Sequence, residues 1–148
     1  MRVKTSWIIS RPLEEVFHSL YDSRMEVKPG IFTFSLFTPR PVQCRVPTGE
    51  AGVGQTRECI SDRGVIYQRI TSYTPYEHFS FVMEETTLPV VKCTISSIEE
   101  DFVLREVEAV EITRTTHIAL QPGWRRIFSP LVYLGIKSVH RYVFRNWE

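Results

Sequence analysis

The sequence predicts an α+β fold in which a curved antiparallel sheet of six to seven strands surrounds one long C-terminal helix. Two observations carry this prediction. Between residues 55 and 120, short runs of alternating apolar and polar side chains are separated by turn signals, which is typical of an antiparallel meander. After Gln121-Pro122-Gly123 the apolar residues take up the helical period and keep it to about residue 144. At 148 residues the chain has the usual size of a single domain, which we expect to span residues 1–148.

The first elements are a strand and a short helix. Apolar and polar residues alternate from Arg2 to Ile9, which predicts a half-buried strand. Pro12 then occupies a favourable first helical position, with acidic residues in the turn that follows. A helix is therefore expected from about Pro12 to Asp22.

Residues 23–54 follow no regular pattern, because prolines and glycines interrupt them repeatedly. Their first half is nevertheless rich in large apolar side chains, namely Ile31, Phe32, Phe34, Leu36 and Phe37. Loops that run over the surface seldom expose so much apolar area. We expect a short helix or strand here, with an apolar cover that folds over the body and gates entry to its interior.

Six strands are expected after this segment. They span residues 55–61, 65–73, 78–86, 90–98, 102–107 and 110–120, with the fourth weak and interrupted before Asp101. Asp62-Arg63-Gly64 is the candidate hairpin turn between the first two. The inward side of residues 65–73 stays open, because Gln68 and Ile70 define one phase and Val65, Tyr67 and Tyr73 the other.

The final helix is expected over residues 124–144, and Pro130 should kink or break its first turns. One broad face is apolar and consists of Trp124, Ile127, Phe128, Leu131, Val132, Gly135, Val139, Tyr142 and Val143. The opposite face carries Arg126, Tyr133, Lys137, His140 and Arg141. A helix of this length is roughly 30 Å long and 10 Å across, too small to fill the hollow of a strongly curved sheet. The sequence therefore predicts a cavity between the sheet and the helix.

Several motifs resemble the START-like superfamily, also called SRPBCC, which includes polyketide cyclases and dehydrases. Residues 11–17, Arg-Pro-Leu-Glu-Glu-Val-Phe, resemble the family's opening A-P-x-E-E-V-[WF] pattern. Gly52-Val53-Gly54, the strand exit at residues 68–75 and the Thr113-Arg114-Thr115-Thr116 run follow in the family's order. The resemblance covers nearly the whole chain. It implies the helix-grip fold, with a cavity for a hydrophobic ligand, and family members include lipid carriers, quinone-binding chaperones, plant hormone receptors and aromatic cyclases.

The strand phases and the helix face give a candidate ligand-binding set. Its members are Glu58, Gln68, Ile70, Phe79, Phe81, Phe102, Arg114, Thr116, Ile118, Ile127, Leu131 and Tyr142. Because an unpaired buried charge is costly, Arg114 should pair with Glu58 or Gln68 and orient the polar end of a ligand. The alternative is a structural ion pair, or a rim position open to water.

No catalytic residue is identified. His117 should point outward, His140 lies on the polar side of the last helix and His78 lies at a turn, so no Ser-His-Asp or Cys-His arrangement is expected. The three cysteines are separated in sequence and no histidine stands at metal-ligand spacing from them, so we expect no metal, no cofactor and no disulfide framework. These features favour a cytoplasmic protein.

The predicted function is the binding or carriage of a lipid, an isoprenoid or quinone, or an aromatic polyketide. One alternative is an enzyme of the cyclase or dehydratase type that uses Glu58, Glu106 and Arg114, and another is a protein-interaction module. Eighteen basic and seventeen acidic residues give no reason to expect nucleic acid, and no pattern indicates an oligomeric state. The basic side of the last helix could make transient contact with a membrane surface, through Arg125, Arg126, Lys137, Arg141 and Arg145.

Overall fold

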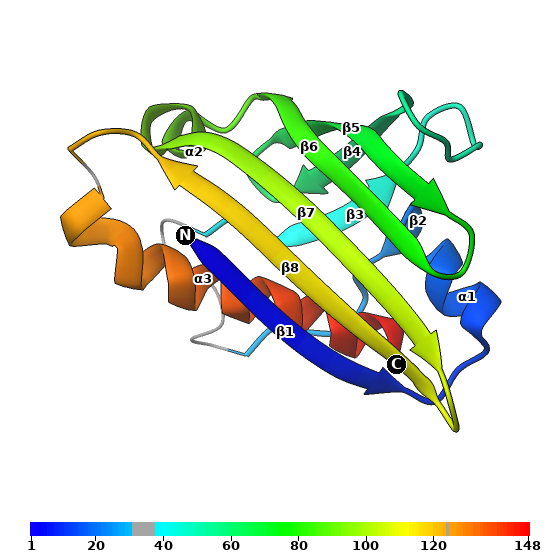
Figure 1. Cartoon of the computed structure of the whole chain (residues 1–148). Coiled ribbons are helices and arrows are strands. Elements are labelled where there is room, and N and C mark those ends of the chain that lie inside the picture. The colour runs from blue at the N-terminus through cyan, green and yellow to red at the C-terminus, as the bar shows by residue number, and fades with distance from the viewer. Residues whose placement is uncertain (31–37, 124) are drawn as a thin grey trace.

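The structure is a computed structural model that describes residues 1–30, 38–123 and 125–148 (Figure 1). Within these ranges the chain forms eight strands and three helices. The strands are β1 (Arg2–Ile9), β2 (Asp22–Arg24), β3 (Pro41–Arg45), β4 (Thr56–Ser61), β5 (Val65–Thr74), β6 (His78–Thr86), β7 (Ile95–Glu106) and β8 (Val110–Leu120). The helices are α1 (Leu13–His18), α2 (Pro89–Thr94) and α3 (Arg125–Trp147).

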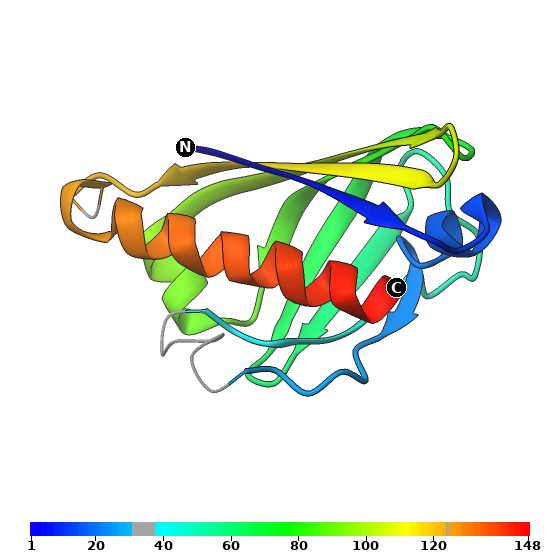
Figure 2. The same cartoon turned by 90° about the horizontal axis from the view of Figure 1, so that it is seen from below.

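All eight strands belong to one antiparallel sheet with the order β1-β8-β7-β6-β5-β4-β3-β2. The sheet bends around α3, which runs along its concave side (Figures 1 and 2). The chain's C-terminus and α1 lie near one end of this arrangement, and α2 lies near the first half of α3 (Figure 2). The predicted α+β architecture is confirmed, with eight strands in place of six to seven.

An aromatic core fills the space under the second half of α3. Phe79, Phe81 and Phe102 of the sheet and Phe144 and Trp147 of α3 are all buried. Their rings form a continuous series, with centroids 5.8 Å apart for Phe79 and Phe81, 5.9 Å for Phe81 and Phe102, and 6.1 Å for Phe102 and Trp147. Spacings of this kind are typical of favourable aromatic packing. This end of the domain is therefore a solid core.

Two of the eight strands lie in the segment for which the sequence shows no regular pattern. The predicted first helix ends at His18, and the chain enters β2 at Asp22 after a turn. The backbone N–H of Val46 donates to the carbonyl of Tyr21 at 2.9 Å, where β2 and β3 begin to pair. The predicted apolar cover, Ile31 to Phe37, lies outside the described residues.

The strand predicted over residues 90–98 is wrong in its first half. Residues Pro89–Thr94 form α2, and β7 then runs without interruption from Ile95 to Glu106. Pro89 has no N–H for a sheet ladder and suits the first turn of a helix, so it starts α2. The acidic run at residues 99–101 does not break β7, because its middle member, Glu100, pairs with an arginine of β8.

Pro130 was expected to kink or break the last helix, and the structure contradicts a break, because α3 continues through this residue. Proline at the sixth helical position removes one backbone hydrogen bond, and the other turns remain. The predicted apolar face packs only in part, because Ile127 is 71% exposed and Leu131 is 50% exposed. None of the described helices is long and apolar enough to cross a membrane.

Candidate functional site

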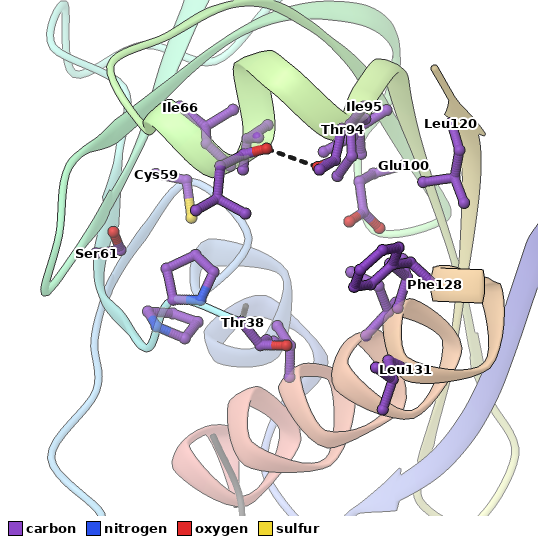
Figure 3. A pocket seen from close by; sticks show the side chains of 18 of the residues that line it. Thr38, Cys59, Ser61, Ile66, Thr94, Ile95, Glu100, Leu120, Phe128 and Leu131 are labelled. Carbon is purple, nitrogen blue, oxygen red and sulfur yellow. Dashed lines mark hydrogen bonds between the residues drawn. The ribbon is translucent and has the colours of Figure 1, made fainter. Parts of the chain in front are cut away.

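A cavity of about 390 Å³ lies between the first half of α3, α2 and the inner face of the sheet. Its walls are mainly apolar, and they include Ile66, Val91, Ile98, Leu120, Val132 and Ile136. Val90 and Leu131 also line it, and they are 40% and 50% exposed, so the rim between α2 and α3 borders solvent. Figure 3 shows Cys59, Glu100 and Phe128 with their side chains around this space.

The cavity exists because the two halves of α3 present different side chains to the sheet. The second half inserts Phe144 and Trp147 into the core, whereas Phe128, Val132 and Ile136 of the helix line the cavity. Gly135 lies next to Ile136, and a Cβ at this position would lie 2.2 Å from Oγ1 of Thr38. The missing side chain thus lets the segment before β3 approach α3 and close one wall of the cavity.

The floor of the cavity contains a buried ion pair. Arg114 of β8 donates from Nε to Oε2 of Glu100 at 2.9 Å and from a terminal nitrogen to Oε1 at 2.6 Å. The side chains of Arg114 and Glu100 are 11% and 5% exposed. Burial opposes the charge on Arg114, but the adjacent Glu100 carboxylate outweighs this effect and the pKa of Arg114 is raised. Such a two-point contact fixes both side chains at the boundary between cavity and core.

A chain of hydrogen bonds extends from the ion pair into α3. The hydroxyl of Thr116 donates to Oε2 of Glu100 at 2.7 Å and lies 2.7 Å from Nε2 of His140. The other ring nitrogen, Nδ1, lies 3.0 Å from Oγ1 of Thr5 on β1. Burial lowers the pKa of His140 to about 2, and the charges of Arg114 and Lys137 add to the shift. His140 is therefore neutral throughout the physiological range.

A second arginine lies below the cavity, and it has no carboxylate partner among the described residues. Arg57 of β4 is 3% exposed and donates to the carbonyl of Leu20 at 2.7 Å and to Oε1 of Gln68. Its guanidinium lies 4.3 Å from the centre of the Phe81 ring. These neutral contacts hold the cation, but they do not balance its charge.

Two hydrogen-bond donors on the floor remain unused within the described part of the chain. Gln68 accepts through Oε1, and its amide nitrogen has no partner there. Arg114 uses Nε and Nη2 for Glu100, and its Nη1 has no partner there. Both side chains line the cavity. A ligand with an acceptor oxygen could satisfy them, whereas an entirely apolar ligand could not.

Two thiols complete this region. Cys44 of β3 and Cys59 of β4 have sulfurs 3.4 Å apart, and Cys59 lines the cavity. The hydrogen bond between the thiols lowers the pKa of Cys44 to about 6, although burial opposes this shift. The positive charges of Arg57 and Arg114 lower the pKa of Cys44 further. The same contact and burial raise the pKa of Cys59. Arg57 thus lies where it favours the thiolate form of Cys44.

Comparison with known proteins identifies the fold. No protein-family model and no curated protein matches the chain. A START superfamily protein from Mycobacterium smegmatis superposes on 98% of this chain and 92% of its own, with a TM-score of 0.66 and 8% sequence identity. The major latex-like protein 151 from Panax ginseng covers 99% of this chain and 97% of its own, with a TM-score of 0.61 and 15% identity. This chain has the START-type helix-grip fold.

A third helix-grip structure is DynU16, a protein of the dynemicin biosynthetic locus. It covers 97% of this chain with a TM-score of 0.59 and 13% identity, and this chain spans 46% of it. The motifs that resembled the family thus predicted the fold correctly. At these identities the likeness extends to the helix-grip fold and carries no residue roles.

The helix-grip architecture brings only part of the predicted ligand-binding set to the cavity. Gln68, Arg114 and Leu131 line it. The remaining predicted residues lie elsewhere. Ile70, Phe79, Phe81 and Phe102 belong to the solid core, Thr116, Ile118 and Tyr142 are buried behind the lining, Ile127 is exposed, and Glu58 is on the outer face.

The inward phase predicted for β4 is wrong. Glu58 pairs with Arg45 on the outer face at 2.8 Å, so Arg114 pairs with Glu100 instead. Arg57 and Cys59 occupy the inner face of β4, where the predicted ligand-binding set had Glu58. An apolar residue usually marks the buried side of a strand, but here the buried side is polar.

In strand β5, residues from both of the alternating sets that the sequence left open face the interior. Gln68 and Ile70 are buried, and Arg69 pairs with Glu84 on the outer face at 3.4 Å. A register shift follows between Ile70 and Ser72, so Tyr73 also packs against the core. An irregularity of this kind changes which residues face inward, and alternation alone does not reveal it.

Three residues of the site were missed or misplaced by sequence reasoning. Arg57 and Glu100 were not considered, and His140 was assigned to the solvent face of the helix although it is fully buried. Glu106, a candidate for acid–base chemistry, is exposed at the end of β7. One signal was present: Glu100 stands two residues before Phe102, so extending the alternation of the predicted strand 102–107 backward would have placed it inward.

The outer face of the sheet carries a Ser-His-Asp row, contrary to the expectation that no such arrangement exists. Nδ1 of His78 lies 2.9 Å from Oγ of Ser72, and Nε2 lies 2.5 Å from Oδ1 of Asp101. The row joins β5, β6 and β7 on the face opposite the cavity. His78 and Asp101 are about one-third exposed, at 34% and 35%. We assign it a structural role as a cross-strand contact.

Proposed function

We propose that this helix-grip domain binds an apolar small molecule that carries one hydrogen-bond acceptor. The observation that supports this most directly is the pairing of apolar cavity walls with the unused donors of Gln68 and Arg114 on the floor. The acceptor, a carbonyl, hydroxyl or carboxylate oxygen, meets these donors. The apolar body lies between α2 and the first half of α3, against Val91 and Val132.

The size of the cavity is consistent with this role. Binding pockets for small ligands usually occupy roughly 300–1,000 Å³, and this one has about 390 Å³. Burying about 300 Å² of apolar ligand surface contributes roughly 7 kcal/mol at 25 cal/mol per Å², before the cost of association. The donors on the floor add orientation more than affinity, because they exchange water for the ligand. A lipid tail, a short isoprenoid or quinone, or a polyketide ring system each has the required character.

The arrangement supports binding more than catalysis. A cyclase or dehydratase needs an acid or base that faces its substrate. Of the carboxylates predicted for this role, Glu58 lies on the outer face and Glu106 is exposed. Glu100 does face the cavity, but both of its oxygens are held by Arg114 and one also accepts from Thr116.

Two measurements test the proposal. Native mass spectrometry of the purified protein should reveal a bound apolar molecule that organic extraction removes. The extracted protein should then bind the neutral fluorescent probe N-phenyl-1-naphthylamine with one-to-one stoichiometry, and the eluted molecule should displace it.

A pair of identical substitutions controls for surface effects. Ile136→Phe places a ring in the cavity and should weaken probe binding at least about tenfold, the equivalent of 1.4 kcal/mol. Ile8→Phe makes the same change on an exposed position of β1, where Ile8 is 67% exposed, and should leave binding unchanged. Equal binding by both variants, or no probe binding by the extracted protein, contradicts the proposal.

A further inference from the structure

The two thiols beside the cavity occupy directly opposed positions of neighbouring strands. Cys44 of β3 pairs with Cys59 of β4 in the antiparallel register, and their sulfurs are 3.4 Å apart. Both thiols are free in this structure. The third cysteine, Cys93, lies on α2 and is exposed. The pair is thus brought together by strand pairing between residues that stand far apart in sequence.

The hydrogen bonds of the flanking strands show which kind of pair this is. Val46 donates to Tyr21 and Met25 donates to Val42, so the even-numbered residues of β3 direct their backbone groups toward β2. On the other side, Ile70 donates to Gln55, which directs the odd-numbered residues of β4 toward β5. Cys44 and Cys59 therefore share no backbone hydrogen bond with each other.

A pair without mutual backbone bonds is the closer of the two antiparallel types. Its Cα atoms are about 4.5 Å apart, and its side chains approach each other more closely than in the bonded type. This separation lies at the short end of the range of about 4.4–6.8 Å that disulfides span. The strand geometry thus allows a disulfide between the two residues.

We propose that Cys44 and Cys59 are an oxidisable dithiol, which a peroxide converts to an intramolecular disulfide and a thiol reductant restores. Cys44 has the character of the attacking group, because the neighbouring thiol and the two arginines favour its thiolate. Cys59 has the character of the resolving group, because it stays protonated beside that thiolate. Cys59 also borders the cavity, through which a molecule as small as hydrogen peroxide can reach the pair.

The reaction balances with hydrogen peroxide as the oxidant. The Cys44 thiolate attacks one peroxide oxygen, the O–O bond breaks, and hydroxide leaves with a proton from solvent as water. This step gives a sulfenic acid at Cys44. The sulfur of Cys59 then attacks the sulfur of Cys44, the S–O bond breaks, and the departing hydroxide takes the thiol proton as a second water. Two thiols lose two electrons, and one peroxide gains them.

Oxidation also changes the surroundings of Arg57. The disulfide removes the thiol that can ionise near Arg57, and no carboxylate among the described residues takes its place. We expect the oxidised domain to favour an acidic ligand over a neutral one. This consequence rests on the proposed function, whereas the disulfide itself does not.

The test uses the Cys93→Ser protein, which lacks the exposed thiol and retains the pair. After treatment with hydrogen peroxide, the protein is unfolded, alkylated with iodoacetamide and weighed by mass spectrometry. We expect a species that has lost two hydrogen atoms and accepts no alkyl group. Dithiothreitol should return both alkylation sites, and peptide mapping should join residue 44 to residue 59.

Single-thiol proteins separate the two roles. Cys59→Ser combined with Cys93→Ser should form a sulfenic acid at Cys44 that dimedone traps, and no internal bridge. Should the Cys93→Ser protein keep two alkylatable thiols after peroxide, or gain oxygen without losing two hydrogens, the proposal is overturned. Because the readout is mass alone, failure of ligand binding leaves this result unaffected.

Discussion

Nε2 of His140 lies 2.7 Å from Oγ1 of Thr116, and this contact determines which ring nitrogen carries the proton. The Thr116 hydroxyl donates its hydrogen bond to the Glu100 carboxylate, which can only accept. In its contact with His140, the hydroxyl oxygen of Thr116 must therefore be the acceptor. Nε2 is therefore protonated, and Nδ1 accepts from the hydroxyl of Thr5 at 3.0 Å. Every bond of this chain is satisfied by a neutral imidazole. A second ring proton would place a positive charge in this buried site, where burial and the charges of Arg114 and Lys137 oppose it.

This neutral histidine predicts a loss of stability in mild acid. The pKa of His140 is about 2 in the folded state, chiefly because of burial, and about 6.5 in an unfolded chain. Below pH 6.5 the unfolded state binds the additional proton, so the free energy of unfolding falls as the pH falls. Between pH 7 and pH 5.5 this single group should lower it by about 1.3 kcal/mol. Urea unfolding at both pH values measures the change.

Two variants isolate the contribution of His140. His140→Gln keeps a side chain that can donate to Thr116 but cannot titrate, so its stability should vary with pH by about 1.3 kcal/mol less than that of the parent. His117→Gln, at an exposed position of β8, should leave the pH dependence unchanged. If His140→Gln showed the same pH dependence as the parent, the neutral assignment would be wrong.

The ion pair of Glu100 and Arg114 should show strong coupling between its partners. Arg114→Gln leaves a carboxylate buried without its partner, and Glu100→Gln leaves a buried guanidinium, so each should cost about 3–5 kcal/mol of unfolding free energy. The double variant removes both charges and retains the length of the Glu100 side chain. It should be more stable than either single variant.

Denaturant unfolding of all four proteins gives the coupling free energy in a double-mutant cycle. A strong interaction appears as a double variant whose loss is clearly smaller than the sum of the two single losses. Additive losses would show that the two residues act independently, which the two hydrogen bonds between them at 2.6 and 2.9 Å do not predict. The pair of Arg11, just before α1, and Glu15, on α1, serves as the control and should couple by less than about 1 kcal/mol, because both side chains are at least one-third exposed.

Most of the fold could be predicted because its long strands alternate and its last helix has a wide apolar face. These patterns predicted the order of strands and helices along the chain, which is the order of a helix-grip fold. Strands β2 and β3 could not be predicted, since three to five residues beside prolines carry no clear period. Helix α2 was missed because β-branched Val90 and Val91 resemble a strand, while the preceding proline determines the outcome.

The site was less predictable, because polar residues face the interior there. The sequence pattern placed Glu58 inward, whereas its neighbours Arg57 and Cys59 face the interior in the structure. His140 was misassigned for the same reason, since its partners are Thr5 of β1, at the other end of the sequence, and Thr116 of β8, the strand that pairs with β1. Tertiary contacts of this kind satisfy buried polar groups without leaving a local pattern.

The division of the domain into a solid half and a hollow half predicts two different responses to truncation. Phe102→Ala removes a ring that is 1% exposed and contacts both Phe81 and Trp147, so it should cost about 3–5 kcal/mol. Val132→Ala enlarges a space that already exists, and its cost should stay near 1 kcal/mol. Thermal or urea unfolding measures both.

Probe binding should respond in the opposite order. Phe102 lies outside the cavity lining, so Phe102→Ala should bind N-phenyl-1-naphthylamine as the parent does at a temperature where it is folded. Val132→Ala removes a wall contact and should change the affinity. If the loss of Phe102 abolished binding in the folded protein, the cavity would extend into the aromatic core and the division would be incorrect.

The Ser72-His78-Asp101 row predicts a structural effect without a catalytic one. Its hydrogen bonds match the chemical order of a hydrolytic triad, but Ser72 lies on the sheet face opposite the cavity and lines neither that space nor the shallow outer groove beside Asp101. Acyl transfer also needs donors arranged for the oxyanion, beyond a nucleophile and a base. Ser72→Ala should therefore leave any background hydrolysis of p-nitrophenyl acetate unchanged, and it should lower the unfolding free energy by less than about 1 kcal/mol, as expected for a partly exposed contact.

Ser6→Ala, which removes another cross-strand hydroxyl contact of 2.8 Å on the same face, is the matched control. A fall in hydrolysis for Ser72→Ala that Ser6→Ala does not share would show that the row is catalytic.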